Sequence, residues 1–428
     1  MAMLPVKEAE SVILSLVQPF DKQLDVEVVD LTDATGRILA CSMTSQLDFP
    51  HWDNSAMDGY AVRYADVQSC NADAPVVLEI VEEIPAGKEP QYSVQQGQAS
   101  RILTGACMPI GADTVVMQER TRREQNRVFI LEAPEPQGFV RHRGSFYRAG
   151  MELLTPGTIL NAPEIAVLAA AQCTKLPVYR RPHVAILSTG DELVTPDQPL
   201  QPGQIVDSNQ YALAALVTQM GGIPQRLGII PDEPEALKTG IAQAISCADI
   251  VLSTGGVSVG DYDYVDQILA QLGAEIHIRS VAMRPGKPLT VATFPPLSDT
   301  ELAGAKRPVL YFGLPGNPVS ALVSCWRFVQ PTLRKLSGWP QQFWEPVFVK
   351  ARSRHDLRSD GKRETYIWGQ LHLVDGTYEF QLASGSHSSG NLINLAKTNS
   401  LAVVPIDKTL IPEGEQVQVL QVSSTLGN

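Results

Sequence analysis

Short apolar runs alternate with longer segments of helical spacing between residues 181 and 336. The runs with strand character are 183–188, 225–230, 249–253, 275–281, 289–294 and 309–312. The segments with helical character are 208–220, 234–246, 262–272 and 318–335. Apolar strands separated by helices favour a mostly parallel sheet that is buried on both faces. We therefore predict a doubly wound α/β domain, a class that binds ligands beyond the carboxyl ends of its strands.

Shorter β-branched runs, punctuated by Pro and Gly, flank this region on both sides. They predict a small all-β domain over 47–143 and a terminal β-barrel or sandwich over 340–428. Segments 1–46 and 144–180 each combine a helical and an extended stretch, so we expect them to form one mixed domain into which the small β domain is inserted. The expected fold class is a multidomain combination of α/β and β.

Charge and hydropathy exclude two classes of partner. The chain has 34 Lys plus Arg against 46 Asp plus Glu, a net charge of −12, whereas nucleic-acid binders need a basic surface. No apolar stretch approaches the roughly 18 residues of a membrane span. Acidic residues precede the short apolar run near the start, so we expect neither a signal peptide nor an anchor there.

The cysteines and histidines suggest a reducing compartment and oxygen-based metal chemistry. Six widely spaced cysteines without a CxxC pair predict buried free thiols, in keeping with a cytoplasmic protein. The seven histidines form no zinc signature. Any metal is therefore expected to have oxygen ligands.

Four loops that follow predicted strands are rich in Gly, Ser, Thr and acidic residues. They are 188–192 (STGDE), 231–233 (PDE), 253–263 (STGGVSVGDYD) and 313–318 (GLPGNP). Since parallel strands end at one edge of a sheet, we expect these loops to meet in one site.

The glycine-rich loop is suited to phosphate binding, with an ordinary tight turn as the alternative. Backbone N–H groups, hydroxyls and a following helix would face an anion there. It is neither a Walker loop nor a GxGxxG motif. The residues concerned are Ser253, Thr254, Gly255, Gly256, Ser258 and Gly260.

Acidic side chains stand at the same edge, where single ones could also be helix caps. Several carboxylates beside a phosphate would repel it unless a hard cation lay between them, which implies a Mg²⁺-type site. These acids are Asp191, Glu192, Asp232, Asp261 and Asp263.

Arg284 and Lys287, separated by a Pro-Gly turn, suit a second anion, or else form a solvated surface pair. Two loops of the small β domain, around Asp58 and Thr104, are open to either a structural or a catalytic role.

Eight blocks of the chain resemble the MoeA family of molybdopterin molybdenumtransferases, also found as the E domains of gephyrin and the plant Cnx proteins. The blocks are NSAMDGYAVR (54–63), RILTGACMPIGADTVVMQE (101–119), STGDEL (188–193), SNQ (208–210), IIPDE (229–233), STGGVSVGDYDYV (253–265), MRPGKPLT (283–290) and GLPGNPVSA (313–321). The resemblance implies an elongated homodimer of four-domain subunits, with a MogA-like α/β domain and a C-terminal β-barrel.

The implied reaction belongs to molybdenum cofactor biosynthesis. Its substrates are adenylylated molybdopterin and molybdate; AMP is released with Mg²⁺ as the usual metal, and molybdenum is inserted at the dithiolene. The implied partners are a MogA-like molybdopterin adenylyltransferase and apo-molybdoenzymes or their chaperones, with neither nucleic acid nor membrane involved.

Site residues carry over by motif. The resemblance implies metal binding by Glu192, Asp232 and Asp263, and catalytic roles for these three with Asp58, Thr104 and Lys287. Asp58 and Thr104 match residues that the family brings to the cleft of the neighbouring subunit. Substrate contacts are expected from Thr189, Gly190, Asp191, Ser208, Asn209, Ser253, Gly255, Gly256, Ser258, Gly260, Asp261, Pro288, Pro315, Gly316, Asn317 and Pro318, and molybdate contacts from Arg284, Lys287, Arg363 and Ser386 or Ser388.

Two departures from the family pattern leave other functions open. Ser145 and Phe146 stand where the family commonly has two acids, and Arg363-Glu364-Thr365-Tyr366 differs from the usual Arg-Thr-Glu-Phe/Tyr order. One alternative is a non-catalytic paralogue that binds molybdopterin or its cofactor as a carrier or scaffold. Another is the preceding adenylylation step, which the Asp58 and Thr104 loops disfavour.

Overall fold

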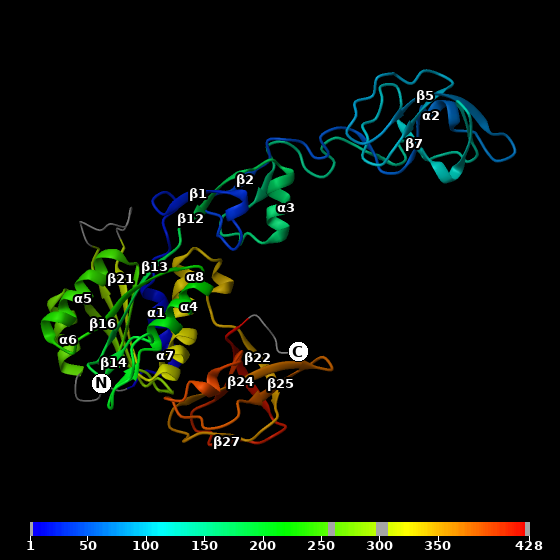
Figure 1. Cartoon of the computed structure of the whole chain (residues 1–428). Coiled ribbons are helices and arrows are strands. Elements are labelled where there is room, and N and C mark those ends of the chain that lie inside the picture. The colour runs from blue at the N-terminus through cyan, green and yellow to red at the C-terminus, as the bar shows by residue number, and fades with distance from the viewer. Residues whose placement is uncertain (1–2, 256–261, 297–306, 424–428) are drawn as a thin grey trace.

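The computed structural model describes residues 3–255, 262–296 and 307–423, apart from the side chains of 262–264. Figure 1 shows an elongated arrangement in which a small β unit lies at one end and is joined through a slender connection to the rest. An α/β unit and a second β unit lie side by side at the other end.

The α/β unit is built on a six-stranded sheet of order β16-β13-β17-β21-β20-β18. Its strands are β13 (His183–Thr189), β16 (Ile223–Ile230), β17 (Ile250–Thr254), β18 (Glu275–Ser280), β20 (Pro288–Phe294) and β21 (Val309–Leu314). β13, β16, β17 and β21 are mutually parallel, and only β20 runs against its neighbours. The prediction of a mostly parallel sheet is confirmed.

Helices cover both faces of this sheet, as predicted. They are α1 (Val6–Leu16), α4 (Asn209–Gln219), α5 (Pro234–Cys247), α6 (Tyr262–Gln271), α7 (Pro318–Ser324) and α8 (Gln330–Leu336). A π-helical segment, Cys325–Val329, joins α7 to α8 within the stretch expected to be one helix.

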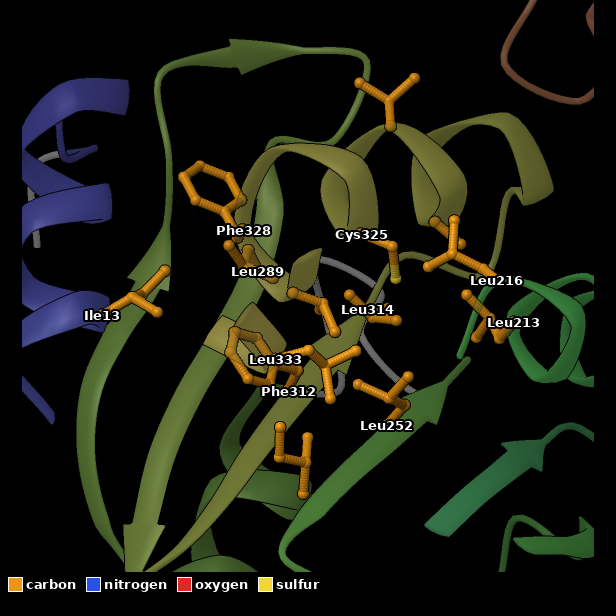
Figure 2. Packing of buried hydrophobic residues seen from close by; sticks show 14 of the residues in the cluster. Ile13, Leu213, Leu216, Leu252, Leu289, Phe312, Leu314, Cys325, Phe328 and Leu333 are labelled. Carbon is orange, nitrogen blue, oxygen red and sulfur yellow. The ribbon is translucent and has the colours of Figure 1, made fainter. Parts of the chain in front are cut away.

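Alternate residues of each strand face two separate cores. Val184 and Ile186 of β13 pack with residues of α1, α4 and α8, whereas Ala185 and Leu187 pack with α5 and α6. Figure 2 shows the first core, in which Ile13 of the N-terminal helix approaches the sheet. Burial of strands on both faces explains their nearly continuous apolar sequences.

Two chain segments on either side of the small β unit pair with each other. β1 (Val26–Asp30) lies antiparallel to β12 (Lys175–Tyr179), and β2 (Met43–Thr44) pairs with β11 (Glu152–Leu154). Helix α3 (Ala162–Ala170) begins at a capping box formed by Asn161 and Glu164, and packs on this small core.

A buried ion network ties this region to the α/β unit. The Arg180 guanidinium binds both carboxylate oxygens of Asp249, at 2.7 and 2.6 Å, and its Nε lies 3.0 Å from Asp25 Oδ1. Asp25 also pairs with Arg307, and both arginines lie over the ring of Phe20.

The small β unit is a six-stranded sheet of order β7-β4-β6-β5-β9-β8 with a short helix, α2 (Tyr64–Val67). Its strands are β4 (Gly59–Val62), β5 (Val76–Ile84), β6 (Gln98–Ile102), β7 (Thr114–Met117), β8 (Thr121–Glu124) and β9 (Arg127–Ile130). At its base, β3 (Asn54–Ser55) pairs with β10 (Val140–Arg141). The short β-branched runs expected here from the sequence form strands, among them β5, β7 and β9.

The C-terminal unit is a closed five-stranded barrel. Of the two folds expected for this region, a barrel or a sandwich, the barrel is the one formed. Its strands are β22 (Phe348–Ser353), β24 (Glu364–Val374), β25 (Thr377–Leu382), β26 (Ser400–Val404) and β28 (Gln416–Gln421). The barrel closes because β24 pairs with both β25 and β26, β22 with β25 and β28, and β26 with β28.

Short strands extend these units. A strand of the α/β unit, β19 (Met283–Arg284), adds to the barrel alongside the start of β24. Two short pairs complete the set: β14 (Leu193–Val194) with β15 (Ile205–Val206), and β23 (Leu357–Arg358) with β27 (Leu410–Ile411).

The six cysteines form no disulfide bond among the described residues, as expected, but the expectation that they are buried holds only for Cys70 and Cys325. Cys41 is exposed, and the others are half-buried. Among the described residues, no helix is both long enough and apolar enough to cross a membrane.

Candidate active site

A pocket of about 720 Å³ opens at the carboxyl ends of β13 and β17, and we call it the rim pocket. Three of the four loops picked out in the sequence contribute to it, together with the segment before α4. Its lining contains ten of the predicted site residues: Thr189, Glu192, Ser208, Asn209, Gly255, Pro288, Pro315, Gly316, Asn317 and Pro318.

The first and third loops approach each other closely at this pocket. Gly255 has a φ of +91°, and a Cβ there would lie 2.2 Å from the carbonyl oxygen of Thr189. Only glycine fits such a contact and such a backbone conformation. The Thr189 side chain is 3% exposed, and among the described residues its hydroxyl has no hydrogen-bond partner. This hydroxyl is therefore a polar group at the pocket that a ligand can satisfy.

On another side of the rim pocket, a hydrogen bond joins a side chain to the backbone. The amide of Asn209 donates to the carbonyl oxygen of Gly316 at 2.8 Å, which links the start of α4 to the loop after β21. Asp207, which the sequence analysis did not single out, also lines the pocket, but its carboxylate accepts hydrogen bonds from Gln210.

The acids at this edge are only partly brought together. Glu192 lines the rim pocket, whereas Asp191 and Asp232 are exposed beside it, the Asp232 N–H donating to Asp191 Oδ1 at 3.1 Å. Gly190, next to Asp191, does not line the pocket. Ser253 is buried and also stays outside the lining. Gly256, Ser258, Gly260, Asp261 and the side chain of Asp263 lie outside the described residues.

The oxygen groups present at the rim pocket show whether these residues suit Mg²⁺. Within residues 3–255, 262–296 and 307–423, no group of three or more His, Cys, Asp or Glu side chains could hold a metal ion. The rim pocket instead offers the Glu192 carboxylate and the unpartnered Thr189 hydroxyl, both oxygen donors. Mg²⁺ commonly uses one or two carboxylates and takes its other ligands from water and substrate phosphates. The donor set therefore fits an ion completed by a phosphate-bearing substrate.

A second pocket, of about 620 Å³, lies where β19 of the α/β unit pairs with β24 of the barrel. We call it the seam pocket. Four predicted residues line it, namely Arg284, Lys287, Arg363 and Ser388, and Pro288 lines both pockets. Ser386 is not in the lining; its carbonyl oxygen accepts hydrogen bonds from Asn391 and Asn394. Of the two serines considered from the sequence, Ser388 is the one at the pocket.

Asp360 links two of these cations and was missed from the sequence. Its Oδ2 lies 3.2 Å from Arg284 and 3.3 Å from Arg363. A hydrogen bond from the Lys362 backbone, aided by Arg363 and Arg284, lowers the pKa of the Asp360 carboxyl below its ordinary value. Lys287 forms no ion pair with any described residue, so its charge is available to a ligand.

A buried network supports the seam pocket from behind. The Tyr366 hydroxyl donates to Glu364 Oε1 at 2.5 Å and accepts from Arg327 Nε at 3.0 Å. Arg327 lies in the π-helical segment and pairs with both carboxylate oxygens of Glu10 on α1. Burial raises the pKa of Tyr366 well above its ordinary value. The unusual order of residues 363–366 thus places Glu364 and Tyr366 in direct contact.

Asp58 and Thr104 lie together in the small β unit. Figure 1 shows this unit at the opposite end of the molecule from the α/β unit and the barrel, whose residues line both pockets. Thr104 donates to Asp58 Oδ1 from its backbone N–H and from its hydroxyl, each at 2.7 Å. These bonds lower the pKa of Asp58, with the backbone bond the larger cause. Both side chains are exposed. Within one chain, the contact between them is already formed, but neither residue lines a pocket.

A third cavity, of about 890 Å³, lies between the mixed region, the α/β unit and the barrel. None of the predicted site residues lines it. The predicted site residues that line a cavity therefore lie at the two smaller pockets.

Comparison with known proteins agrees with this architecture. Family models match the MoeA N-terminal region (domain I and II) at residues 4–171, a "Probable molybdopterin binding domain" at 185–335, and the MoeA C-terminal region (domain IV) at 350–422.

Relatives match over almost the whole chain. It is 64% identical over 417 residues to the molybdopterin molybdenumtransferase of Nostoc sp., covering 97% of this chain and 93% of that protein. It is 33% identical to the molybdopterin molybdenumtransferase of Haemophilus influenzae, covering 99% and 100%. A crystal structure of the molybdopterin biosynthesis MoeA protein from Pyrococcus horikoshii has a TM-score of 0.80 at 29% identity, covering 98% of this chain and 100% of that one. The chain therefore belongs to the MoeA family of molybdopterin molybdenumtransferases, which are transferases of molybdenum cofactor biosynthesis.

Proposed function

We propose that the chain takes adenylylated molybdopterin and molybdate, releases AMP with the help of Mg²⁺, and inserts the molybdenum at the dithiolene. The observation that carries this proposal is the pair of adjoining pockets that share Pro288. One pocket has the hydroxyls and close backbone approach suited to a phosphate-bearing ligand. The other has three cationic side chains suited to an oxyanion.

In the rim pocket, Asn209, Ser208 and Asn317 would orient the nucleotide and pterin parts of the substrate. Glu192 and the Thr189 hydroxyl would face its phosphates, with Asp232, Asp191 and Asp263 close to the same edge. Mg²⁺ bound there would neutralise phosphate charge and favour attack of water on the phosphoanhydride. Glu192 would then help to orient that water.

In the seam pocket, Lys287, Arg284 and Arg363 would hold molybdate by charge-assisted hydrogen bonds, with Ser388 beside them. Asp360 would hold the guanidinium groups of Arg284 and Arg363 in fixed positions. Since Pro288 lines both pockets, molybdate bound here would lie next to the substrate in the rim pocket.

Asp58 and Thr104 would act in the cleft of a second copy in a homodimer. Their hydrogen-bonded pair is already formed but lies far from the pockets of its own chain (Figure 1). We place this reaction in the cytoplasm, with a MogA-like adenylyltransferase supplying the substrate and apo-molybdoenzymes or their chaperones receiving the product.

The variant Lys287→Ala tests the division between the pockets. Loss of this cation should weaken molybdate use at least tenfold, because hydrogen bonds to charged groups are worth about 1.5–3 kcal/mol. AMP binding should stay as in the parent chain. Lys22→Ala, an exposed change outside the three cavities, is the matched control. Equal losses of molybdate use and AMP binding would contradict the assignment.

A carrier or scaffold without turnover is the second candidate, and Ser145 and Phe146 favour it. The Phe146 ring is 62% exposed and tilts against Phe49, so no carboxylate stands at this position. Changing both residues to Glu and Asp separates the candidates. A strong rise in turnover would show that the missing acids limit catalysis in this chain and would support the carrier or scaffold. A turnover rate that is already high and does not change would support the transferase.

A further inference from the structure

One residue of the wall of the seam pocket carries an indole N–H that no group of the described residues satisfies. Trp368, on β24, is 2% exposed and lines the pocket. Among the described residues, its Nε1 has no hydrogen-bond partner. A buried donor without a partner costs free energy, so such groups in folded proteins usually serve a ligand or water.

The other polar groups at this wall do not compete for that N–H. The Tyr366 hydroxyl is engaged with both Glu364 and Arg327. The His387 ring packs on Trp368, with centroids 4.6 Å apart, and its Nε2 lies 2.9 Å from the carbonyl oxygen of Ala383. A carbonyl only accepts, so Nε2 carries the hydrogen. Nδ1 has no hydrogen-bond partner among the described residues. His387 thus fixes the indole in place without accepting from it.

The chemistry of the unpaired group defines what it can bind. An indole N–H is a donor only, and it is uncharged. Its complement is a ligand rich in acceptor oxygens, held in the same pocket by Lys287, Arg284 and Arg363. A fully deprotonated tetrahedral oxyanion has this character, since each of its oxygens accepts and none donates.

We propose that Trp368 Nε1–H donates a hydrogen bond to the oxyanion in the seam pocket, as a further specificity-determining residue. The inference rests on the proposed function, because it takes the seam pocket as the molybdate site. The cations supply attraction at any orientation, whereas the buried N–H donates only to a ligand whose oxygen reaches it. Trp368 therefore contributes geometry rather than charge.

The test compares binding of sodium molybdate to the full-length chain and its variants by calorimetry. Trp368→Phe keeps an aromatic ring against His387 but removes the donor, and it should weaken molybdate binding about tenfold or more, as expected for one hydrogen bond to a charged acceptor. Trp344→Phe is the matched control. It removes an indole donor that binds the Trp339 carbonyl outside the seam pocket, and it should leave molybdate binding unchanged.

A second measurement needs no substitution that threatens the core. Of the chain's 5 indole ¹⁵N–¹H resonances, one belonging to a buried, slowly exchanging N–H should shift as molybdate saturates the unaltered protein. If no indole resonance moves although molybdate binds, or if Trp368→Phe binds as tightly as the parent, the inference is wrong. If Lys287→Ala also leaves molybdate binding unchanged, the proposed function of the pocket falls as well, which separates the two failures.

Discussion

Asp58 and Thr104, 46 positions apart in the chain, form a two-point contact in which one carboxylate oxygen accepts both the backbone N–H and the hydroxyl of the threonine at 2.7 Å. Gly59, the next residue, could not be replaced without a clash, because a Cβ there would lie 2.0 Å from the carbonyl oxygen of Val116. These contacts hold the loop in an exposed position on the small β unit, which lies at one end of the molecule (Figure 1).

Subunit complementation tests where this pair acts. Asp58→Asn and Lys287→Ala should each lower turnover at least tenfold as pure homodimers, at a molybdate concentration that does not saturate the variant. When the two variants are unfolded and reassembled together, about a quarter of the parent rate should return, since half of the dimers contain one intact composite site. If no activity returns, although mixed dimers form, Asp58 does not act in a partner's cleft.

The hydrogen bonds that Thr104 donates to Asp58 predict how the pKa of Asp58 responds to substitution of Thr104. Its pKa in the folded chain lies below the ordinary 3.8. The stabilisation from this contact is thus complete above the ordinary pKa and is lost as pH falls through the lowered one. Thr104→Ala removes the hydroxyl bond and should raise the pKa of Asp58, measured by carboxyl ¹³C NMR. Thr121→Ala, in the same β unit, should not; a Thr104→Ala pKa equal to the parent value would contradict this account.

Two glycines with the same backbone angle allow the effect of a steric clash to be distinguished from the effect of backbone strain. Gly255 and Gly203 both have a φ of +91°, but only Gly255 faces a neighbour, the Thr189 carbonyl oxygen. Both alanine variants should lose some stability, whereas Gly255→Ala alone should displace the rim loops and lower kcat/KM by about a hundredfold, as misplacements near 1 Å can do. Equal kinetics in the two variants would show that the close approach is unimportant.

The buried ion network predicts a large loss of stability on truncation. Asp249 is almost fully buried, and Asp249→Ala leaves the Arg180 charge without its bidentate partner. Breaking one side of such a pair typically costs about 3–5 kcal/mol. Removing Glu124, which pairs with Arg122 on the surface, should cost less than about 1 kcal/mol. Urea unfolding of both variants, followed by circular dichroism, measures the difference, and similar midpoints would contradict the structural role of the network.

The sequence was informative where local periodicity determines structure. All six strands of the α/β sheet could be placed, because burial on both faces makes the strands continuously apolar. Asp360 could not be anticipated, since its partner Arg284 lies 76 positions away and meets it only because β19 joins the barrel. The unpartnered N–H of Trp368 likewise depends on packing between two units.

The most direct test of the central claim is single-turnover release of AMP from purified adenylylated molybdopterin, with Mg²⁺ present and molybdate present or absent. The account predicts fast release that depends on molybdate and is accompanied by formation of molybdenum cofactor. Tight binding of the substrate without release of AMP, with molybdate and Mg²⁺ both present, would contradict it and would make the chain a carrier.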